Sequence, residues 1–242
     1  MKRFFKKKKK REPSLLEQYD PESFGAIEIQ RLFGMLSRKG SGSGFMSIMV
    51  TSPLPQEGKS LLVGNLALVA AHAHQRTLIL DADMRRPIQH RQFHLSSSPG
   101  LSDYLQKTVE FDQIFHNTEL ENLKLIPCGS HVSSPSALLQ LGIPDFKALL
   151  DRCQMDFDIV FVDVPPVIPV NDAERIASLV DGVVLVVTSG KTYREIIDRA
   201  LKLLDRSNCN LLGIVLNNVK GVLPYYYESG YSQYSAGPIW SE

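Results

Sequence analysis

Residues 58–60 read Gly-Lys-Ser and lie between a short apolar segment and a stretch with helical periodicity. A loop in this position can bind phosphate, because backbone N–H groups of the loop and of the following helix N-terminus point toward the anion. Lys59 can then bridge the β- and γ-phosphates, and the Ser60 hydroxyl can bind Mg²⁺. The match is partial, because the full pattern has glycine where this chain has Pro53. The expected nucleotide-binding residues are Pro55, Gln56, Glu57, Gly58, Lys59, Ser60 and Leu61.

Three aspartates follow apolar segments elsewhere in the chain. Asp81 and Asp83 come after residues 78–80, and Asp163 comes after residues 159–162. Alternating residues of an extended chain point the same way, so we expect Asp81 and Asp83 on one side. Mg²⁺ takes few carboxylates together with phosphate oxygens and waters, and this number of acids suits a metal–ATP site. One such aspartate alone is better explained as a cap of a turn or helix; three of them beside a Gly-Lys-Ser loop favour the catalytic interpretation.

Short apolar runs alternate with helical periodicity from residue 45 onward. The predicted strands are residues 45–50, 77–80, 123–126, 158–162, 182–188 and 211–216, and the predicted helices are residues 61–71, 144–152, 172–179 and 194–204. This alternation predicts an α/β, P-loop NTPase fold in which helices cover both faces of a mostly parallel central sheet. The runs are too uniformly apolar to leave one face of a strand in water. Ligands of such sheets bind outside the carboxyl ends of the strands, where the loop and the aspartates lie.

The two ends of the chain differ from this central region. Residues 1–44 contain a basic arm, an amphipathic segment and a Ser/Gly-rich connector at residues 37–44, and residues 45–219 form the expected nucleotide-binding domain. Residues 220–242 lose the apolar periodicity and are expected to be a flexible tail. Five of the eight tyrosines lie in this tail: Tyr225, Tyr226, Tyr227, Tyr231 and Tyr234.

Charge is distributed unevenly along the chain. The first eleven residues hold eight basic side chains and no acid, whereas residues 12–242 hold 19 basic against 26 acidic side chains, a net of −7. An acidic body excludes a general nucleic-acid binder. The basic arm can contact an anionic membrane surface or remain a solvated arm. The arm precedes no apolar segment of secretory or membrane-spanning length, and the three cysteines show no C-x-x-C spacing, so a cytoplasmic protein is expected.

Three segments resemble the motifs of the bacterial tyrosine kinase (BY-kinase) family. The loop at residues 52–60, the D-x-D-x-R pattern at residues 78–86 and the D-x-P ending of residues 159–165 are similar to its Walker A, Walker A′ and Walker B motifs. Further similarity lies at residues 100–105, 135–139 and 180–187. The resemblance covers nearly all of residues 45–219, and the tyrosine-rich tail adds to it.

The resemblance implies an ATP- and Mg²⁺-dependent autokinase that phosphorylates its own tail tyrosines and regulates exopolysaccharide or capsule synthesis. It implies that Lys59 and Ser60 hold phosphate and Mg²⁺ and that Asp83 and Asp163 organise the metal. Asp81 is then placed near the attacking tyrosine hydroxyl, either as its base or as support for the metal. Arg85 is a further candidate to neutralise charge in phosphoryl transfer.

Partners are also implied by the resemblance. Family members are often fused to a membrane-spanning activator, whereas this chain resembles the split arrangement in which a polysaccharide co-polymerase activator is a separate membrane protein. Recruitment to the inner face of the membrane follows. A homo-oligomer is expected, although only the start of the family's E-x-x-R-x-x-R subunit-contact motif is present, at Glu28 and Arg31, with Gly34 in place of the second arginine. Gln56 stands where the family usually has glycine.

Two other functions are compatible with parts of the sequence. A Min/Par-type positioning ATPase shares the fold, but usually carries an early lysine in the phosphate loop that residues 52–55 lack, and has no need of a tyrosine cluster. A non-catalytic nucleotide-binding scaffold is the second alternative, and Gln56 is the departure that favours it. Asn217, after the last predicted strand, can contact the nucleobase or cap a turn with Asn218.

Overall fold

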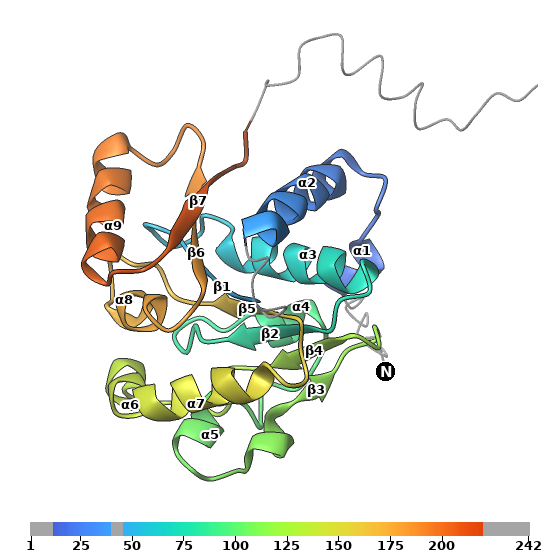
Figure 1. The fold of residues 1–242 in the computed structure, drawn as a ribbon, viewed down its shortest axis with the longest axis vertical. Helices are drawn as coiled ribbons and strands as arrows, with labels where there is room; N and C mark the ends of the chain where they lie inside the picture. Colours follow the sequence, from blue (N-terminus) through green and yellow to red (C-terminus); the bar gives the residue numbers. More distant parts are fainter. Residues whose placement is uncertain (1–11, 40–45, 220–242) are drawn as a thin grey trace, which may run out of the picture.

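The computed structural model describes residues 12–39 and 46–219. Within them a seven-stranded sheet has the order β3-β4-β2-β5-β1-β6-β7 (Figure 1). All neighbouring strands are parallel except β3 and β4. The strands are β1 (Met46–Thr51), β2 (Thr77–Asp81), β3 (His116–Asn117), β4 (Leu123–Ile126), β5 (Ile159–Asp163), β6 (Gly182–Thr188) and β7 (Leu211–Asn217). The predicted fold class is confirmed.

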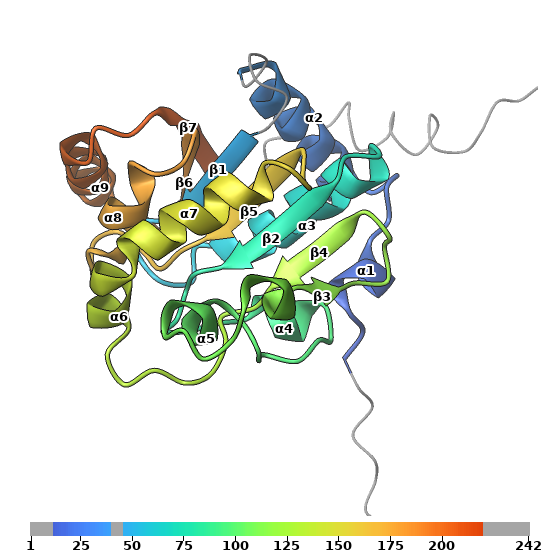
Figure 2. The ribbon, with the colours of Figure 1, turned by 60° about the horizontal axis from the view of Figure 1, so that its bottom comes forward.

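Helices cover both faces of this sheet (Figures 1 and 2). The helices on one face are α1 (Leu15–Gln18), α2 (Phe24–Lys39), α3 (Lys59–His72) and α4 (Gln89–Gln92). Those on the other face are α5 (Leu101–Leu105), the 3₁₀ helix η1 (Phe111–Ile114), α6 (Pro135–Leu141), α7 (Ile143–Cys153), α8 (Asp172–Ala177) and α9 (Arg194–Arg206). Each face has its own apolar core, one built around α3 and the other around α7.

The apolar strands are buried as their composition predicts, with one exception. Every residue of β1, β2, β5 and β6 is buried. The expectation that no strand has a wet face is wrong for β7, where Ile214 is 47% and Leu216 is 55% exposed. The reason is position, because β7 is the edge strand of the sheet and α9 covers it only in part.

Helix α2 lies outside the predicted boundary of the nucleotide-binding domain at residue 45, yet it contributes to the core. Phe33 and Leu36 are buried in the same apolar cluster as α3. This second layer explains why α3 is apolar nearly all round, since the sheet covers one side and α2 covers the other. The predicted connector at residues 37–44 is wrong for residues 37–39, which continue α2; residues 40–45 lie outside the described residues.

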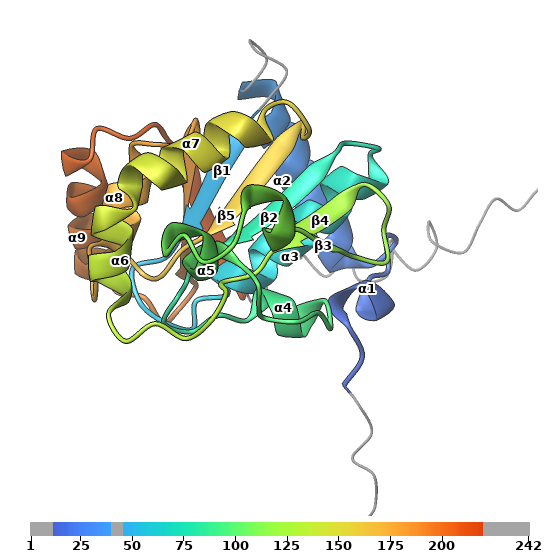
Figure 3. The same cartoon turned by 90° about the horizontal axis from the view of Figure 1, so that it is seen from below.

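Strand order brings the predicted chemistry to one place. Strands β2, β5 and β1 are neighbours (Figure 3). Asp81 of β2 pairs in register with Asp163 of β5. Parallel strands place their carboxyl ends at the same edge of a sheet. The loops after these three strands therefore converge. None of the described helices is long and apolar enough to cross a membrane.

We predict that Phe33→Ala lowers the free energy of unfolding by about 3–5 kcal/mol, because it removes a buried aromatic ring between α2 and α3. Urea denaturation followed by circular dichroism measures the change. Met35→Ala is the matched control, because Met35 lies on the same helix and is 59% exposed. Similar losses in the two variants would contradict the placement of α2 in the core.

Candidate active site

The loop between β1 and α3 is tied to the loop that follows β5. The hydroxyl of Thr51 donates to the carbonyl oxygen of Pro165 at 3.0 Å. The backbone N–H of Val167 donates to the carbonyl oxygen of Ser52 at 2.9 Å. These bonds join the segment that carries Lys59 to the segment that follows Asp163.

Gly58 is the residue immediately before α3, and its backbone has a conformation that few other residues adopt. Its φ is +89°, and a Cβ atom at this position would lie 2.1 Å from Nδ2 of Asn217. Nδ2 of Asn217 donates to the carbonyl oxygen of Glu57 at 2.9 Å, and its Oδ1 accepts from the N–H of Asn218 at 2.8 Å. Asn217 thus holds the phosphate loop and also caps the turn with Asn218; contact with a nucleobase stays a prediction.

Gln56 adopts a left-handed conformation with φ +65°. Such a φ is uncommon for residues other than glycine, and it explains why glycine suits this position. The departure from the family at Gln56 therefore falls at a position where the backbone needs positive φ, and the loop adopts that conformation despite the side chain.

The side chain of Glu57 is buried within the loop. Its carboxylate accepts hydrogen bonds from the Thr192 hydroxyl and from the N–H of Leu54 at 3.4 Å. Glu57 therefore joins the phosphate loop to the segment between β6 and α9, a contact that no sequence motif indicated.

Lys59 lies at the centre of the site. Its Nζ is 2.7 Å from Oδ2 of Asp83, 3.2 Å from Oδ1 of Asp163 and 3.1 Å from Oγ of Ser60. Lys59 and both aspartates are buried. The structure thus brings together four of the residues predicted to hold phosphate and metal.

Electrostatics in this cluster follow from burial and pairing. Burial alone lowers the pKa of Lys59, but the charges of Asp163 and Asp83 outweigh it and raise the pKa above its ordinary value. Burial raises the pKa of Asp163, although Lys59 opposes this shift. The ammonium group therefore keeps its charge and favours the ionised form of Asp163.

The oxygen donors in this cluster fit Mg²⁺. Ser60 Oγ, Asp83 Oδ2 and Asp163 Oδ1 all lie within 3.2 Å of one cationic nitrogen. Few carboxylates and a hydroxyl, completed by phosphate and water, are the donor set that Mg²⁺ takes. Among the described residues no three His, Cys, Asp or Glu side chains form a metal cluster by themselves.

Asp81 is fully buried at the end of β2. Its Oδ1 accepts from the N–H of Asp83 at 3.2 Å, and its Oδ2 accepts from the N–H of Gln89 at 3.1 Å. Burial, reinforced by the charge of Asp163, raises the pKa of Asp81 well above its ordinary value, although the Gln89 N–H opposes the shift.

Asp83 lies beyond the strand end, where its Oδ1 accepts from the N–H groups of Arg85 and Arg86 at 3.3 and 3.0 Å.

Arg85 contacts a different set of residues. Its guanidinium donates to Oδ2 of Asp172 at 3.2 Å and to Oγ of Ser136 at 2.6 Å. Ser136 in turn donates to Asp172. Arg85 thus joins the Walker A′ segment to α6 and α8, and its predicted role in catalysis stays a prediction.

Gln89 is a site residue that the sequence did not reveal. Its side-chain Nε2 donates to Oδ2 of Asp163 at 2.8 Å and to the carbonyl oxygen of Ser60 at 2.9 Å. A lone glutamine eight residues after Asp81 carries no recognisable signal, so only the fold shows this contact.

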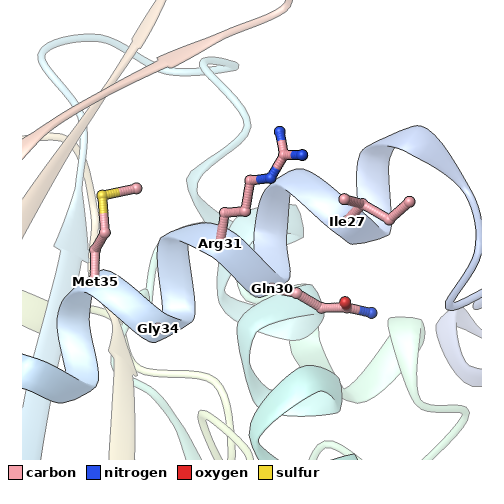
Figure 4. Close-up of a pocket in the computed structure, with 5 residues that line it drawn as sticks. All are labelled: Ile27, Gln30, Arg31, Gly34 and Met35. Atoms are coloured by element: carbon pink, nitrogen blue, oxygen red, sulfur yellow. The ribbon is translucent and has the colours of Figure 1, made fainter.

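Helix α2 carries an open surface hollow of about 620 Å³. It is lined by Ile27, Gln30, Arg31, Gly34 and Met35 (Figure 4). Arg31 also pairs with Glu28 along the helix. Of the two matching residues of the predicted subunit-contact motif, Arg31 lines this hollow, and Glu28 is its ion-pair partner.

Known proteins resemble the chain over most of its length. A family model described as the NUBPL iron-transfer P-loop NTPase (ParA) matches residues 46–230. The tyrosine-protein kinase YwqD of Bacillus subtilis is 30% identical over 218 residues, which are 90% of each chain. The tyrosine-protein kinase CpsD of Streptococcus agalactiae is 33% identical over 78% of this chain and 82% of its own. The chain belongs to the BY-kinase family.

Solved structures agree with this assignment. The crystal structure of the chimerical protein CapA2B2 is 30% identical, covers 85% of this chain and 89% of its own, and superimposes with a TM-score of 0.77. MinD of Pyrococcus horikoshii, bound to Mg-ADP, has a TM-score of 0.62 at 14% identity over 77% of each chain. The likeness to MinD shows the fold alone. The iron-transfer description of the P-loop model has no counterpart in cysteine spacing, because Cys128, Cys153 and Cys209 are far apart.

Asp81 gives this BY-kinase a predictable pH dependence. Its pKa in the folded state is raised above the ordinary 3.8. Between pH 3.8 and the folded-state pKa, Asp81 is therefore ionised in the unfolded chain and protonated in the folded protein. The stability of the wild type, relative to Asp81→Asn, should therefore fall as pH rises from 3.8, by at most about 1.4 kcal/mol per pH unit. Urea denaturation at several pH values measures both proteins.

The control is Asp158→Asn. Arg76 lowers the pKa of Asp158 below its ordinary 3.8, so the wild type should gain stability over this variant only as pH rises toward 3.8, with no further change in the difference at higher pH. Parallel stability curves for Asp81→Asn and wild type would contradict the raised pKa of Asp81.

Proposed function

We propose that this protein is an ATP-dependent protein-tyrosine kinase that phosphorylates the tyrosine cluster of its own tail. The observation that carries the proposal is the contact of Lys59 with Ser60, Asp83 and Asp163, which combines a phosphate-binding cation with a set of oxygen donors. The family to which the chain belongs supports tyrosine as the acceptor.

Each residue of the cluster has a distinct task in phosphoryl transfer. The N–H groups at the start of α3 and the ammonium of Lys59 bind and orient the β- and γ-phosphates. Ser60, Asp83 and Asp163 hold Mg²⁺, which neutralises charge on the phosphates when bound. This transfer needs positioning and charge neutralisation more than covalent help from the protein.

Asp81 is the proposed acceptor of the tyrosine proton. A tyrosine hydroxyl has a pKa of about 10, and a carboxylate with a raised pKa is a stronger base toward it than an ordinary aspartate. Support of the metal site through Asp83 is the alternative role, because the N–H of Asp83 donates to Asp81. Arg85 and Asn217 are proposed, respectively, as a charge-neutralising group and a nucleobase contact.

The proposed phosphate acceptors are Tyr225, Tyr226, Tyr227, Tyr231 and Tyr234, which lie outside the described residues. Of the tyrosines in residues 12–219, Tyr19 stacks on His72 and Tyr104 packs against Phe111, whereas Tyr193 is 76% exposed. Tyr19 and Tyr104 are engaged in these ring contacts and are poor candidates for phosphate acceptors. Residues 220–242 contain five of the eight tyrosines and are the preferred candidates.

Partners and location follow from the proposed kinase. We infer a homo-oligomer whose subunits meet at the α2 hollow, where Arg31 is available and Gly34 leaves room. A CapA-like membrane co-polymerase on a separate chain is the proposed activator, supported by the chimeric CapA2B2 relative. Control of exopolysaccharide or capsule synthesis follows from such a partner, and the basic arm at residues 1–11, also outside the described residues, is proposed to add contact with the inner face of the membrane.

We predict that Lys59→Met lowers autophosphorylation by at least about 100-fold, because it removes the cation that stabilises the transferring phosphoryl group. Incubation with labelled ATP and Mg²⁺, followed by mapping of phosphotyrosine, measures the effect. Lys147→Met is the matched control, since Lys147 pairs only with Asp151 on the surface of α7. Wild-type phosphorylation of Lys59→Met would refute the site, and ATP hydrolysis without phosphotyrosine in the wild type would favour a positioning ATPase.

Transfer between subunits is a separate prediction. An active chain lacking residues 221–242 is mixed with a full-length Lys59→Met chain, and phosphotyrosine is mapped on the latter. We expect phosphate on its tail, because a chain inactive in transfer can be modified only by its neighbour. A Lys59→Met chain with the five tail tyrosines changed to phenylalanine is the control. If the Lys59→Met chain remains unmodified while the intact enzyme phosphorylates itself, transfer is confined to one chain.

A further inference from the structure

Gln89 lies between the phosphate loop and the two strand-end carboxylates. It is the first residue of α4 and is fully buried. Its side chain bridges Asp163 and the backbone of Ser60, and its own N–H donates to Asp81. One residue thus contacts three elements of the site: the end of β2, the end of β5 and the start of α3.

The orientation of the Gln89 amide is determined by its partners. The carbonyl oxygen of Ser60 is always an acceptor, and Oδ2 of Asp163 is an acceptor when the carboxylate is ionised. The amide nitrogen of Gln89 must therefore face both oxygens. The amide oxygen, Oε1, is buried and has no hydrogen-bond partner among the described residues. A buried carbonyl oxygen without a donor is costly, so the contacts that hold Gln89 in place are those of its amide nitrogen.

The two oxygens of Asp163 have different partners. Oδ2 accepts from Gln89 at 2.8 Å, whereas Oδ1 faces Nζ of Lys59 at 3.2 Å. With Oδ2 held by Gln89, Oδ1 is the oxygen directed into the Lys59 cluster. Gln89 also holds the carbonyl oxygen of the residue whose hydroxyl completes the donor set, Ser60.

We propose that Gln89 is a positioning residue for the metal of the nucleotide site. It orients Asp163 and Ser60 so that their oxygens can bind Mg²⁺, and its side-chain hydrogen bonds within the described residues go to Asp163 and to the Ser60 carbonyl oxygen, not to Lys59. The inference rests on the proposed Mg²⁺–ATP site. Residues that orient metal ligands typically contribute about 10–100-fold to metal affinity.

This role separates metal binding from nucleotide binding. Replacement of the Gln89 side chain leaves its backbone N–H, and therefore the hydrogen bond to Asp81, in place. Phosphate contacts made by Lys59 and by the start of α3 do not involve Gln89. Loss of the side chain should therefore weaken the Mg²⁺-dependent part of nucleotide binding and leave the metal-independent part unchanged.

The test compares wild type with Gln89→Met, which keeps a side chain of similar length without a donor. Binding of a fluorescent, non-hydrolysable ATP analogue is measured in EDTA and then as a function of Mg²⁺ concentration. We expect equal affinity in EDTA and a half-saturating Mg²⁺ concentration raised by about 10–100-fold in the variant. At saturating Mg²⁺ the autophosphorylation rate should recover toward that of the wild type.

Gln92→Met is the matched control, because Gln92 lies on the same short helix and packs near Gly64 of α3 without any hydrogen bond to the site. It should leave the Mg²⁺ requirement unchanged. If Gln89→Met does not fold, as judged by thermal melting, Gln89→Leu is measured in the same way.

Two results would overturn the proposal. An unchanged half-saturating Mg²⁺ concentration would show that Asp163 is oriented without Gln89. An equal loss of affinity in EDTA and in Mg²⁺ would show that Gln89 only supports the loop. Failure of the proposed kinase function is distinguishable, because it appears as Mg²⁺-dependent nucleotide binding without phosphotyrosine in the wild type.

Discussion

The ion pairs of Lys59 with Asp83 and Asp163 are the interaction on which the site depends. Burying one carboxylate without a partner costs several kcal/mol, and here three buried carboxylates lie at one edge of the sheet. The ammonium of Lys59 contacts two of them directly. Asp81 has no ion pair with Lys59, and burial together with the charge of Asp163 raises its pKa well above the ordinary value. This arrangement suits a site that binds a polyanion and a divalent cation. The polyanion would pair with Lys59, and the divalent cation would pair with the carboxylates.

Hydrogen bonds from neutral groups also stabilise the three buried carboxylates, since one cation contacts only two of them. Asp81 and Asp83 accept from backbone N–H groups of the turn after β2, and Asp163 accepts from the amide of Gln89. These donors are fixed by the backbone and by α4, so they hold the carboxylates in place without adding charge. The phosphate loop is held in the same manner by Asn217 and Glu57. These hydrogen bonds hold the carboxylates and the phosphate loop in place before any ligand binds, which is the preorganisation that electrostatic catalysis requires.

The surfaces outside the site have different explanations. Helix α2 is anchored by the buried Phe33 and Leu36 and also presents a hollow, where the proposed subunit contact would lie. The exposed apolar residues of β7 follow from its place at the edge of the sheet, with the end of the strand leading into residues 220–242. Both features lie on elements that also contact α3 or the phosphate loop.

The sequence by itself determined the class of fold and most strands of the sheet, because buried parallel strands are uniformly apolar. It also singled out Lys59, Ser60, Asp83 and Asp163 as candidates for one site, and the structure places their side chains together. Tertiary structure alone decided that Arg85 pairs with Asp172, that Glu57 meets Thr192 and that Gln89 holds Asp163. These pairs join residues 74 to 135 positions apart. Local pattern carries no information about such distant partners, since their proximity arises from the order in which the strands pack. The same reason explains β7, whose apolar sequence resembles that of a central strand and whose partial exposure depends only on its place at the edge.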